Sequence, residues 1–311
     1  MLGALLGVWG AWRGLVALAE WGVMQTPTDW DKELGAMAAK EIEGGAHVCT
    51  DSRLQAFADA MKDALVGEVK HDPFDFEFKV LREDAVNAFA LPGGYVFINS
   101  GLLERAEDSS EVAGVLGHEI NHALLRHGMK RIGRQLAVSL VVRVFLGGLG
   151  GLNTQAAGLA ANLGELSFSR GEESEADAAG LPIVADAGFE PEGMIRFFKK
   201  LTEEESDVGE GAKTVMRYMS THPLTEDRIS DIRALIKKEH LAPNPDYADR
   251  VKTLDAELAA VSHTCDAAGD AGRDAADGDD ERGRDRTPGG DGDEAESERA
   301  PDRGAEREGG R

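Results

Sequence analysis

The chain has 311 residues, of which 57 are acidic and 34 basic, so its formal net charge is −23. This length is enough for one good-sized domain with additional segments. Because phosphate binding requires a basic surface, the charge excludes nucleic acid as an expected partner and disfavours electrostatic binding to an anionic membrane.

Residues 1–24 form an apolar segment in which Arg13 and Glu20 are the only charged residues. Ala17-Leu18-Ala19 resembles a signal-peptidase site, but no basic segment precedes it. The charge of Arg13 argues against a membrane span, whereas three tryptophans are typical of a helix that lies at a membrane interface. Three interpretations remain open: an export signal, a membrane-surface anchor and a buried N-terminal helix.

The next part of the chain is expected to form two amphipathic helices and then a small sheet. The helices lie within residues 28–66. Between Phe74 and Val80, apolar and charged residues alternate, which predicts a half-buried strand. Val86–Ala90 and Tyr95–Ile98 are predicted to be two further strands around the turn Pro92-Gly93-Gly94. We expect an antiparallel sheet.

An H-E-x-x-H motif follows the predicted sheet and indicates a metal site. His118 and His122 are four residues apart, so on a helix both imidazoles share one face and reach one zinc ion. Glu119 then lies beside the water that such a zinc ion carries. The segment 108–111 is typical of a helix start, and Gly128 is the expected helix end.

An apolar, glycine-rich stretch, residues 135–166, separates this helix from an acidic run. Two interpretations of the stretch stay open: a mobile flap over a cleft, and a buried helical hairpin. In the acidic run, Glu173 and Asp177 are four residues apart and share a helical face. They suit a glutamate ligand with an aspartate that orients a zinc-bound histidine, although a solvated helix face is the alternative.

Three more helices are expected near residues 191–205, 225–240 and 246–261, which completes one catalytic domain over residues 25–261. Residues 262–311 are rich in Asp, Gly, Arg, Glu and Ala, and are predicted to be a disordered acidic tail. Cys49 and Cys265 lack metal-ligand spacing, and Cys265 falls in this tail. The remaining histidines are expected to be surface residues: His47, His71, His127, His240 and His263.

Four sequence blocks, in order, resemble the gluzincin peptidases typified by HtpX, the CAAX prenyl protease, the OMA-type mitochondrial protease and BepA. The resemblance extends from about Glu33 to about Ile236. The blocks are Asn87–Gly94, the H-E-x-x-H motif at His118–His122, the S-R-x-x-E-x-x-A-D motif at Ser169–Asp177, and His222–Ile229, which begins with His-Pro and ends with Arg-Ile.

The resemblance implies a predominantly helical α+β, zincin-like domain with a small antiparallel sheet, and a zinc metalloendopeptidase activity. It implies one Zn²⁺ per chain, held by His118, His122 and Glu173 rather than by a neighbouring glutamate. Glu119 would be the catalytic base, and Asp177 would orient a zinc-bound histidine.

The resemblance also places the His-Pro block at the active site. His222 would either donate a hydrogen bond to the oxyanion or occupy the open zinc position in a latched resting state. Arg228 would tether the block through an ion pair. The strand Asn87-Ala88-Phe89-Ala90 would border the cleft and pair with an extended substrate.

The implied substrates are polypeptides, mainly misfolded or damaged proteins, because the chain resembles compact, single-domain members of the family. The alternative is a zinc-containing chaperone or assembly factor with little or latched activity. Family members mostly work at or across membranes, which favours export or anchoring of residues 1–24 and a location in the cell envelope, with the cytoplasm as the alternative.

Overall fold

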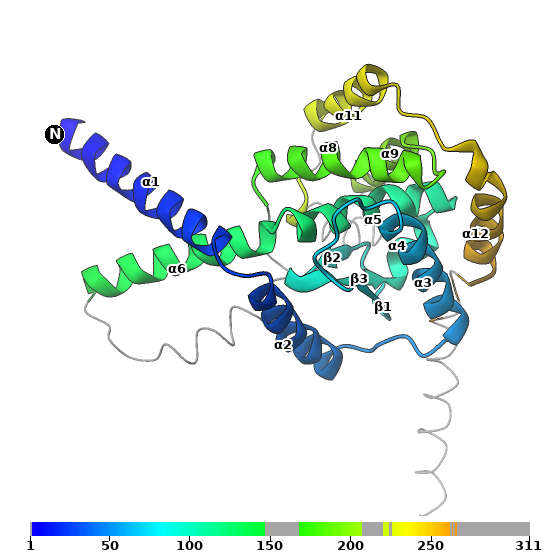
Figure 1. Ribbon diagram of the computed structural model, residues 1–311, viewed down its shortest axis with the longest axis horizontal. Helices are drawn as coiled ribbons and strands as arrows, with labels where there is room; N and C mark the ends of the chain where they lie inside the picture. Colours follow the sequence, from blue (N-terminus) through cyan, green and yellow to red (C-terminus); the bar gives the residue numbers. More distant parts are fainter. Residues whose placement is uncertain are drawn as a thin grey trace, which may run out of the picture. The chain divides into compact units, whose positions relative to one another are not determined.

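Figure 1 shows the computed structural model, which describes residues 2–146, 168–206, 220–223, 226–261, 263 and 265. The chain divides into a unit Met1–Ala271 and a second unit Gly272–Arg311, which lies outside the described residues. Residues 147–166 of the glycine-rich stretch, for which a flap and a helical hairpin were both considered, and nearly all of the predicted tail also lie outside them.

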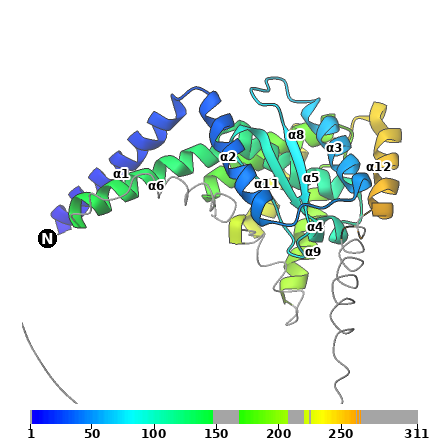
Figure 2. The ribbon, with the colours of Figure 1, turned by 90° about the horizontal axis from the view of Figure 1, so that it is seen from below.

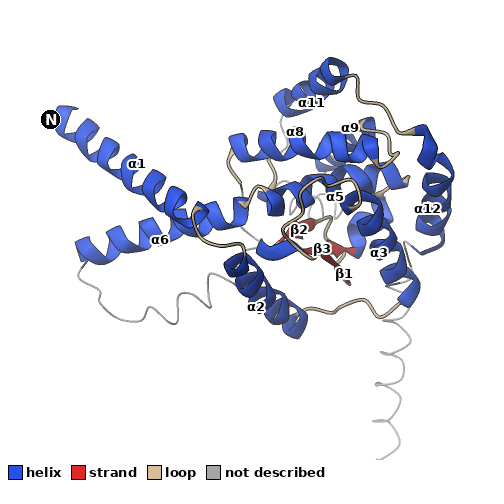
Figure 3. Ribbon diagram, viewed as in Figure 1, coloured by secondary structure: helices blue, strands red, loops and turns tan. Residues whose placement is uncertain are grey.

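The described chain is mainly helical with one small sheet, which confirms the expected α+β class (Figure 3). The helices are α1 (Leu2–Met24), α2 (Asp29–Gly45), α3 (Ser52–Val66), α4 (Ser100–Arg105), α5 (Ser109–Leu124), α6 (His127–Leu146), α8 (Arg170–Asp186), α9 (Glu192–Ser206), α11 (Glu226–Glu239) and α12 (Ala248–Val261). The strands are β1 (Glu77–Leu81), β2 (Ala88–Ala90) and β3 (Tyr95–Asn99), with 3-10 turns η1 (Pro92–Gly94) and η3 (Pro245–Tyr247).

The three-stranded sheet has the order β1-β3-β2 and is mixed. β2 and β3 form the expected antiparallel hairpin, whose turn contains Gly93 at a φ of 83°. β1 instead runs parallel to β3, so the expectation of a wholly antiparallel sheet was wrong. The alternation in β1 shows which face is buried, but it contains no information about the partner strand or its direction.

The two edges of the sheet have different neighbours. The outer edge of β1 is covered by residues 47–49, because the Arg82 N–H donates to His47 O at 2.7 Å and the Cys49 N–H donates to Val80 O at 2.9 Å. No described strand pairs with the outer edge of β2, which faces α5 instead. The open edge of the sheet therefore lies beside the helix that carries the H-E-x-x-H motif.

α5 lies between the sheet and the helices α8 and α9 (Figures 1 and 2). It begins where expected, because the Asp108 carboxylate accepts a hydrogen bond from the Glu111 N–H at 2.9 Å. It ends at Leu124 rather than at Gly128, because Arg126 adopts a φ of 56° and breaks the helix. The Arg126 side chain is held by Asp31, with Nε donating to Oδ1 at 2.9 Å, and α6 starts immediately afterwards at His127.

α1 runs alongside α6 (Figures 1 and 2), and an ion pair of 3.0 Å joins Glu20 to Arg134. Several large apolar side chains of α1 are exposed, among them Trp9 at 61% and Trp21 at 62%. The described chain thus covers α1 only in part. No described helix has the length and apolarity needed to cross a membrane.

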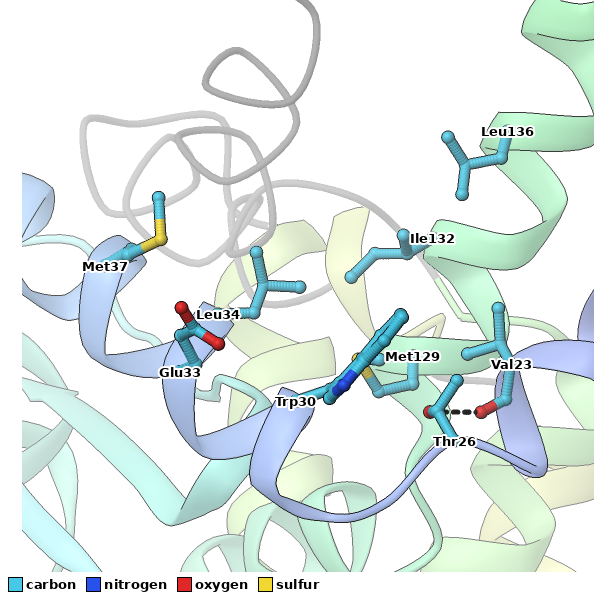
Figure 4. Close-up of a pocket in the computed structure, with 9 residues that line it drawn as sticks. All are labelled: Val23, Thr26, Trp30, Glu33, Leu34, Met37, Met129, Ile132 and Leu136. Carbon is cyan, nitrogen blue, oxygen red and sulfur yellow. Dashed lines mark hydrogen bonds between the residues drawn. The ribbon is translucent and has the colours of Figure 1, made fainter. Parts of the chain in front are cut away.

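A mostly apolar hollow of about 270 Å³ lies between the end of α1, α2 and α6 (Figure 4). Trp30 and Met37 of α2 border it and are 60% and 59% exposed.

The position of Cys265 differs from the expectation. This residue was expected in the disordered tail, but it is 2% exposed and packs in the main hydrophobic core.

The crossing of α5 and α8 is a backbone-to-backbone contact. A Cβ atom added to Gly180 would lie 2.8 Å from the carbonyl oxygen of Gly117 and 3.1 Å from the amide nitrogen of His118. Real Cβ atoms do not approach a backbone oxygen this closely, so the helices would have to separate. Glycine at this crossing allows α8 to lie close to the first histidine of the motif.

We predict that Gly180→Ala lowers the free energy of unfolding by about 1–3 kcal/mol, because the added methyl group overpacks the crossing. Alanine has a higher helix propensity than glycine, so a loss of stability in this variant would come from packing alone. Gly171→Ala on the same helix is the matched control, since nothing lies within 4 Å of its added Cβ. Urea unfolding curves measure the free energy of unfolding of both variants. Equal stability of the two variants would contradict the close approach of the helices.

Candidate metal centre

Four buried side chains bring ligand atoms to one point. His118 and His122 of α5, Glu173 of α8 and His222 each offer one atom, and these atoms all lie within 4.8 Å of one another. The two Nε2 atoms of His118 and His122 are 2.9 Å apart. Glu173 lies 3.5 Å from His118 Nε2 and 3.4 Å from His122 Nε2. We call these four residues the ligand cluster.

Three glutamates lie near the start of α8, and local contacts leave only Glu173 facing the histidines. Ser169 and Glu172 form a capping box, in which the Ser169 N–H donates to the Glu172 carboxylate at 2.9 Å. Arg134 also binds Glu172, at 2.8 Å. Glu175 points outward, with a side chain that is 59% exposed. Glu173 is left to face the histidines.

His118 is held from behind by a buried carboxylate and an arginine. Its Nδ1 lies 2.8 Å from Asp177 Oδ1, on the opposite side of the ring from the ligand cluster. Arg228 of α11 donates two hydrogen bonds to Asp177, at 2.7 Å from Nε and 2.8 Å from its terminal nitrogen. It also pairs with Glu173. The structure thus places Asp177 and Arg228 beside the ligand cluster.

His222 contacts both the ligand cluster and Glu119. Its Nδ1 lies 3.1 Å from Glu173 Oε1 and 3.3 Å from His118 Nε2. Its Nε2 lies 3.3 Å from Glu119 Oε1. The His-Pro segment therefore reaches the centre although 100 residues separate it from the H-E-x-x-H motif.

Glu119 joins the metal centre to the open edge of the sheet. Its Oε2 accepts a hydrogen bond from the Ala90 N–H at 3.0 Å. The main-chain groups of Asn87 and Leu91 bond to β3, so by alternation those of Ala88 and Ala90 face away from β3. The segment that resemblance assigned to substrate binding, which includes Phe89, therefore forms an edge strand beside Glu119.

The electrostatics of the cluster differ between its first two histidines: the pKa of His118 is raised, whereas burial and the neighbouring His118 hold the pKa of His122 well below the usual range. Burial lowers the pKa of His118, but Asp177 and Glu173 outweigh this effect and raise the pKa to about 9. Burial raises the pKa of Glu119, which the charge of His222 offsets only in part. For Glu173, burial is outweighed by the neighbouring histidines, which hold its pKa well below the usual range.

The donor set of the cluster fits a zinc ion. Imidazole nitrogens with one carboxylate are the usual ligands of catalytic zinc, and three of them leave one position open. Two nitrogen lone pairs that face each other at 2.9 Å repel unless a proton or cation lies between them. A divalent cation at this point would supply the positive charge that the buried carboxylates favour.

Two residues of the site were missed by the sequence reasoning. His127 was expected at the surface but is fully buried, with Nδ1 3.0 Å from His122 Nδ1. Phe168 packs on the His122 ring with centroids 4.0 Å apart. Spacing could not reveal His127, because residues five apart do not share a helical face. The break at Arg126 brings it back toward His122.

A cavity of about 690 Å³, lined by both polar and apolar side chains, lies beside the centre, between α1, α6 and the start of α8. Phe168 and Glu175 line it together with residues of α1, including Arg13 and Glu20. The ring that packs on His122 is thus also a wall of this cavity.

Comparison with known proteins agrees with this geometry. The model of peptidase family M48 matches residues 50–236, which is more than half of the chain. A beta-barrel assembly-enhancing protease of Yersinia pestis is 29% identical over 229 residues, which cover 70% of this chain and 46% of that protein. The corresponding protein of Escherichia coli (strain K12) is 28% identical over 215 residues, covering 65% and 43%.

A mitochondrial metalloendopeptidase OMA1 of Schizosaccharomyces pombe is 34% identical over 170 residues, which cover 53% of this chain and 49% of that protein. The chain thus spans about half the length of these relatives or slightly less. The expected family is confirmed: the chain belongs to peptidase family M48.

Proposed function

We propose that the chain is a zinc-dependent metalloendopeptidase that hydrolyses peptide bonds in misfolded or damaged proteins. The observation that carries the proposal is the position of Glu119 between the ligand cluster and the open edge of β2. A candidate metal site, a candidate base and a strand that could pair with an extended polypeptide meet there, which is the arrangement that peptide hydrolysis requires.

His118, His122 and Glu173 are the proposed zinc ligands. A zinc ion held there would supply Lewis acidity, which would polarise the scissile carbonyl and lower the pKa of the attacking water. Asp177 orients the His118 ring through the hydrogen bond to Nδ1, and Arg228 holds Asp177 in turn. Arg228 is therefore a positioning residue rather than one that touches the substrate.

Glu119 is the proposed base. One of its oxygens is engaged by the Ala90 N–H, and the other faces the ligand cluster beside His222. Because burial raises its pKa, Glu119 is a stronger base than an exposed glutamate. It takes a proton from the attacking water and transfers it to the nitrogen of the leaving amine.

The open edge of β2 is the proposed binding site for the substrate backbone. Main-chain groups of Ala88 and Ala90 face away from β3, on the side where an extended chain would pair, and the Ala90 N–H is engaged by Glu119 in this structure. Main-chain pairing depends little on the amino-acid sequence of the substrate, which suits a protease that acts on unfolded segments of many proteins. The names of the relatives, which refer to assembly of beta-barrels and to mitochondria, support a location in the cell envelope or at a membrane.

A second candidate function is a chaperone or assembly factor whose proteolysis is latched. The observation that favours it is His222, which supplies a fourth ligand atom and lies 3.3 Å from Glu119 Oε1. In this position it would compete with the attacking water for the place beside Glu119. Movement of the His-Pro segment would then be required before cleavage.

We expect Glu119→Gln to keep zinc and to lower casein hydrolysis by about 10²–10⁴-fold, because the amide cannot accept the proton. Casein cleavage and zinc content of the purified wild type and variant provide the test. Undiminished cleavage by the variant would remove Glu119 as the base.

The adjacent substitutions Glu173→Gln and Glu172→Gln test the choice of ligand. Glu173→Gln removes the anionic ligand and should leave less than one zinc per chain after dialysis against a weak chelator. Glu172→Gln preserves the capping box, since glutamine also serves there, and should keep full zinc content. Zinc loss from the Glu172 variant alone would reverse the assignment.

His222→Ala distinguishes the two roles of His222. If His222 latches the centre, the variant keeps zinc through the other three ligands and cleaves casein several-fold faster than wild type. This is the expected result, because the side chain contacts both Glu119 and Glu173. Retained zinc with a lower rate would instead assign His222 to stabilisation of the oxyanion.

A further inference from the structure

His127 lies behind the second histidine of the ligand cluster, outside the ligand set. It is the first residue of α6 and is fully buried. Its Nδ1 is 3.0 Å from His122 Nδ1, and its Nε2 is 3.2 Å from Glu175 Oε2. His122, His127 and Glu175 thus form a chain of side chains that starts at the centre and ends at the adjoining cavity.

One assignment of protons satisfies every contact in this chain. His122 Nε2 lies 2.9 Å from His118 Nε2 and 3.4 Å from Glu173, so this atom faces the metal position. A metal-binding Nε2 carries no proton, which places the proton of neutral His122 on Nδ1. His122 Nδ1–H then donates to His127 Nδ1, and His127 Nε2–H donates to the carboxylate of Glu175.

We propose that His127 is a positioning residue that fixes the ring and the tautomer of His122, so that Nε2 of His122 faces the metal. Glu175 holds His127 in the tautomer that accepts at Nδ1. Partners of this kind orient metal-bound histidines in many metal sites. The role rests on the zinc site proposed above.

The two histidine ligands consequently have different supports. Behind His118 lies a buried carboxylate, Asp177, which is held by Arg228. Behind His122 lies an imidazole, and its carboxylate is one residue farther out and 59% exposed. The charge that stabilises His122 is therefore at the solvent side of the centre, where Lys130 also approaches Glu175 at 3.5 Å.

Packing and hydrogen bonding at His122 are separable by substitution. The His122 ring packs on Phe168, which would hold it in place without His127. His127→Asn places an amide oxygen near the position of the imidazole Nδ1 and keeps an acceptor for His122. His127→Leu fills a similar volume but offers no acceptor. His71→Leu is the matched control, because His71 is exposed and far along the chain from the site.

The experiment measures the zinc dissociation constant of the full-length variants by competition with a chromophoric chelator. The Co²⁺ absorption spectrum and the melting temperature of the metal-free proteins are recorded alongside. We expect His127→Leu to weaken zinc binding by about 10–100-fold and to alter the Co²⁺ spectrum. His127→Asn should recover most of the affinity, and the His71 control should match wild type.

Glu175→Ala supplies an independent test at an exposed position, where folding is not at risk. It should weaken zinc binding in the same direction as His127→Leu but by a smaller factor. Equal affinity of wild type, His127→Leu and Glu175→Ala would overturn the proposal, even if melting temperatures fell. Equally weak binding by His127→Asn and His127→Leu would overturn the acceptor role. Wild-type protein that binds no zinc would refute the proposed function itself, and with it the role of His127.

Discussion

The metal centre depends on how closely α5 and α8 approach each other at Gly117 and Gly180. Glu173, Asp177 and Gly180 recur on one face of α8 at helical spacing. When Gly180 lies against the backbone next to His118, the two carboxylates on the same face must lie along the motif-bearing helix. A contact between two glycines therefore sets the positions of Glu173, the proposed ligand, and of Asp177.

Burial makes each charge in the centre depend on another. Carboxylates and imidazoles that lose water are stable only when they are paired and hydrogen-bonded. Glu173 and Asp177 meet this requirement through Arg228, which reaches them from α11, and through the histidines. Because Arg228 and His222 belong to one sequence block, the same segment that neutralises the carboxylates also brings His222 against Glu119. Charge pairing at the carboxylates and access to Glu119 are thus linked.

Much of the site was predictable from the sequence because its chemistry is encoded in short spacings. His118 and His122 share a helical face at any position in a fold, and Asp108 starts their helix by a local hydrogen bond. The amphipathic helices α2 and α3 and the hairpin of β2 and β3 were likewise predictable from local pattern. The assignment of Glu173 and the His-Pro block came from the resemblance to known peptidases, since spacing alone left the acidic run ambiguous.

The sequence by itself determined the secondary structure near the motif, the residues that are candidates for metal ligands, and the family. Only the tertiary structure decided which residues meet across the chain. The parallel pairing of β1 with β3, the burial of Cys265 and the contact of His127 with His122 all depend on chain reversals whose geometry is not local. At Arg126, a left-handed residue held by a distant aspartate ends one helix and starts the next. A periodic sequence pattern cannot predict such a contact, because the residues that form it are far apart in the sequence.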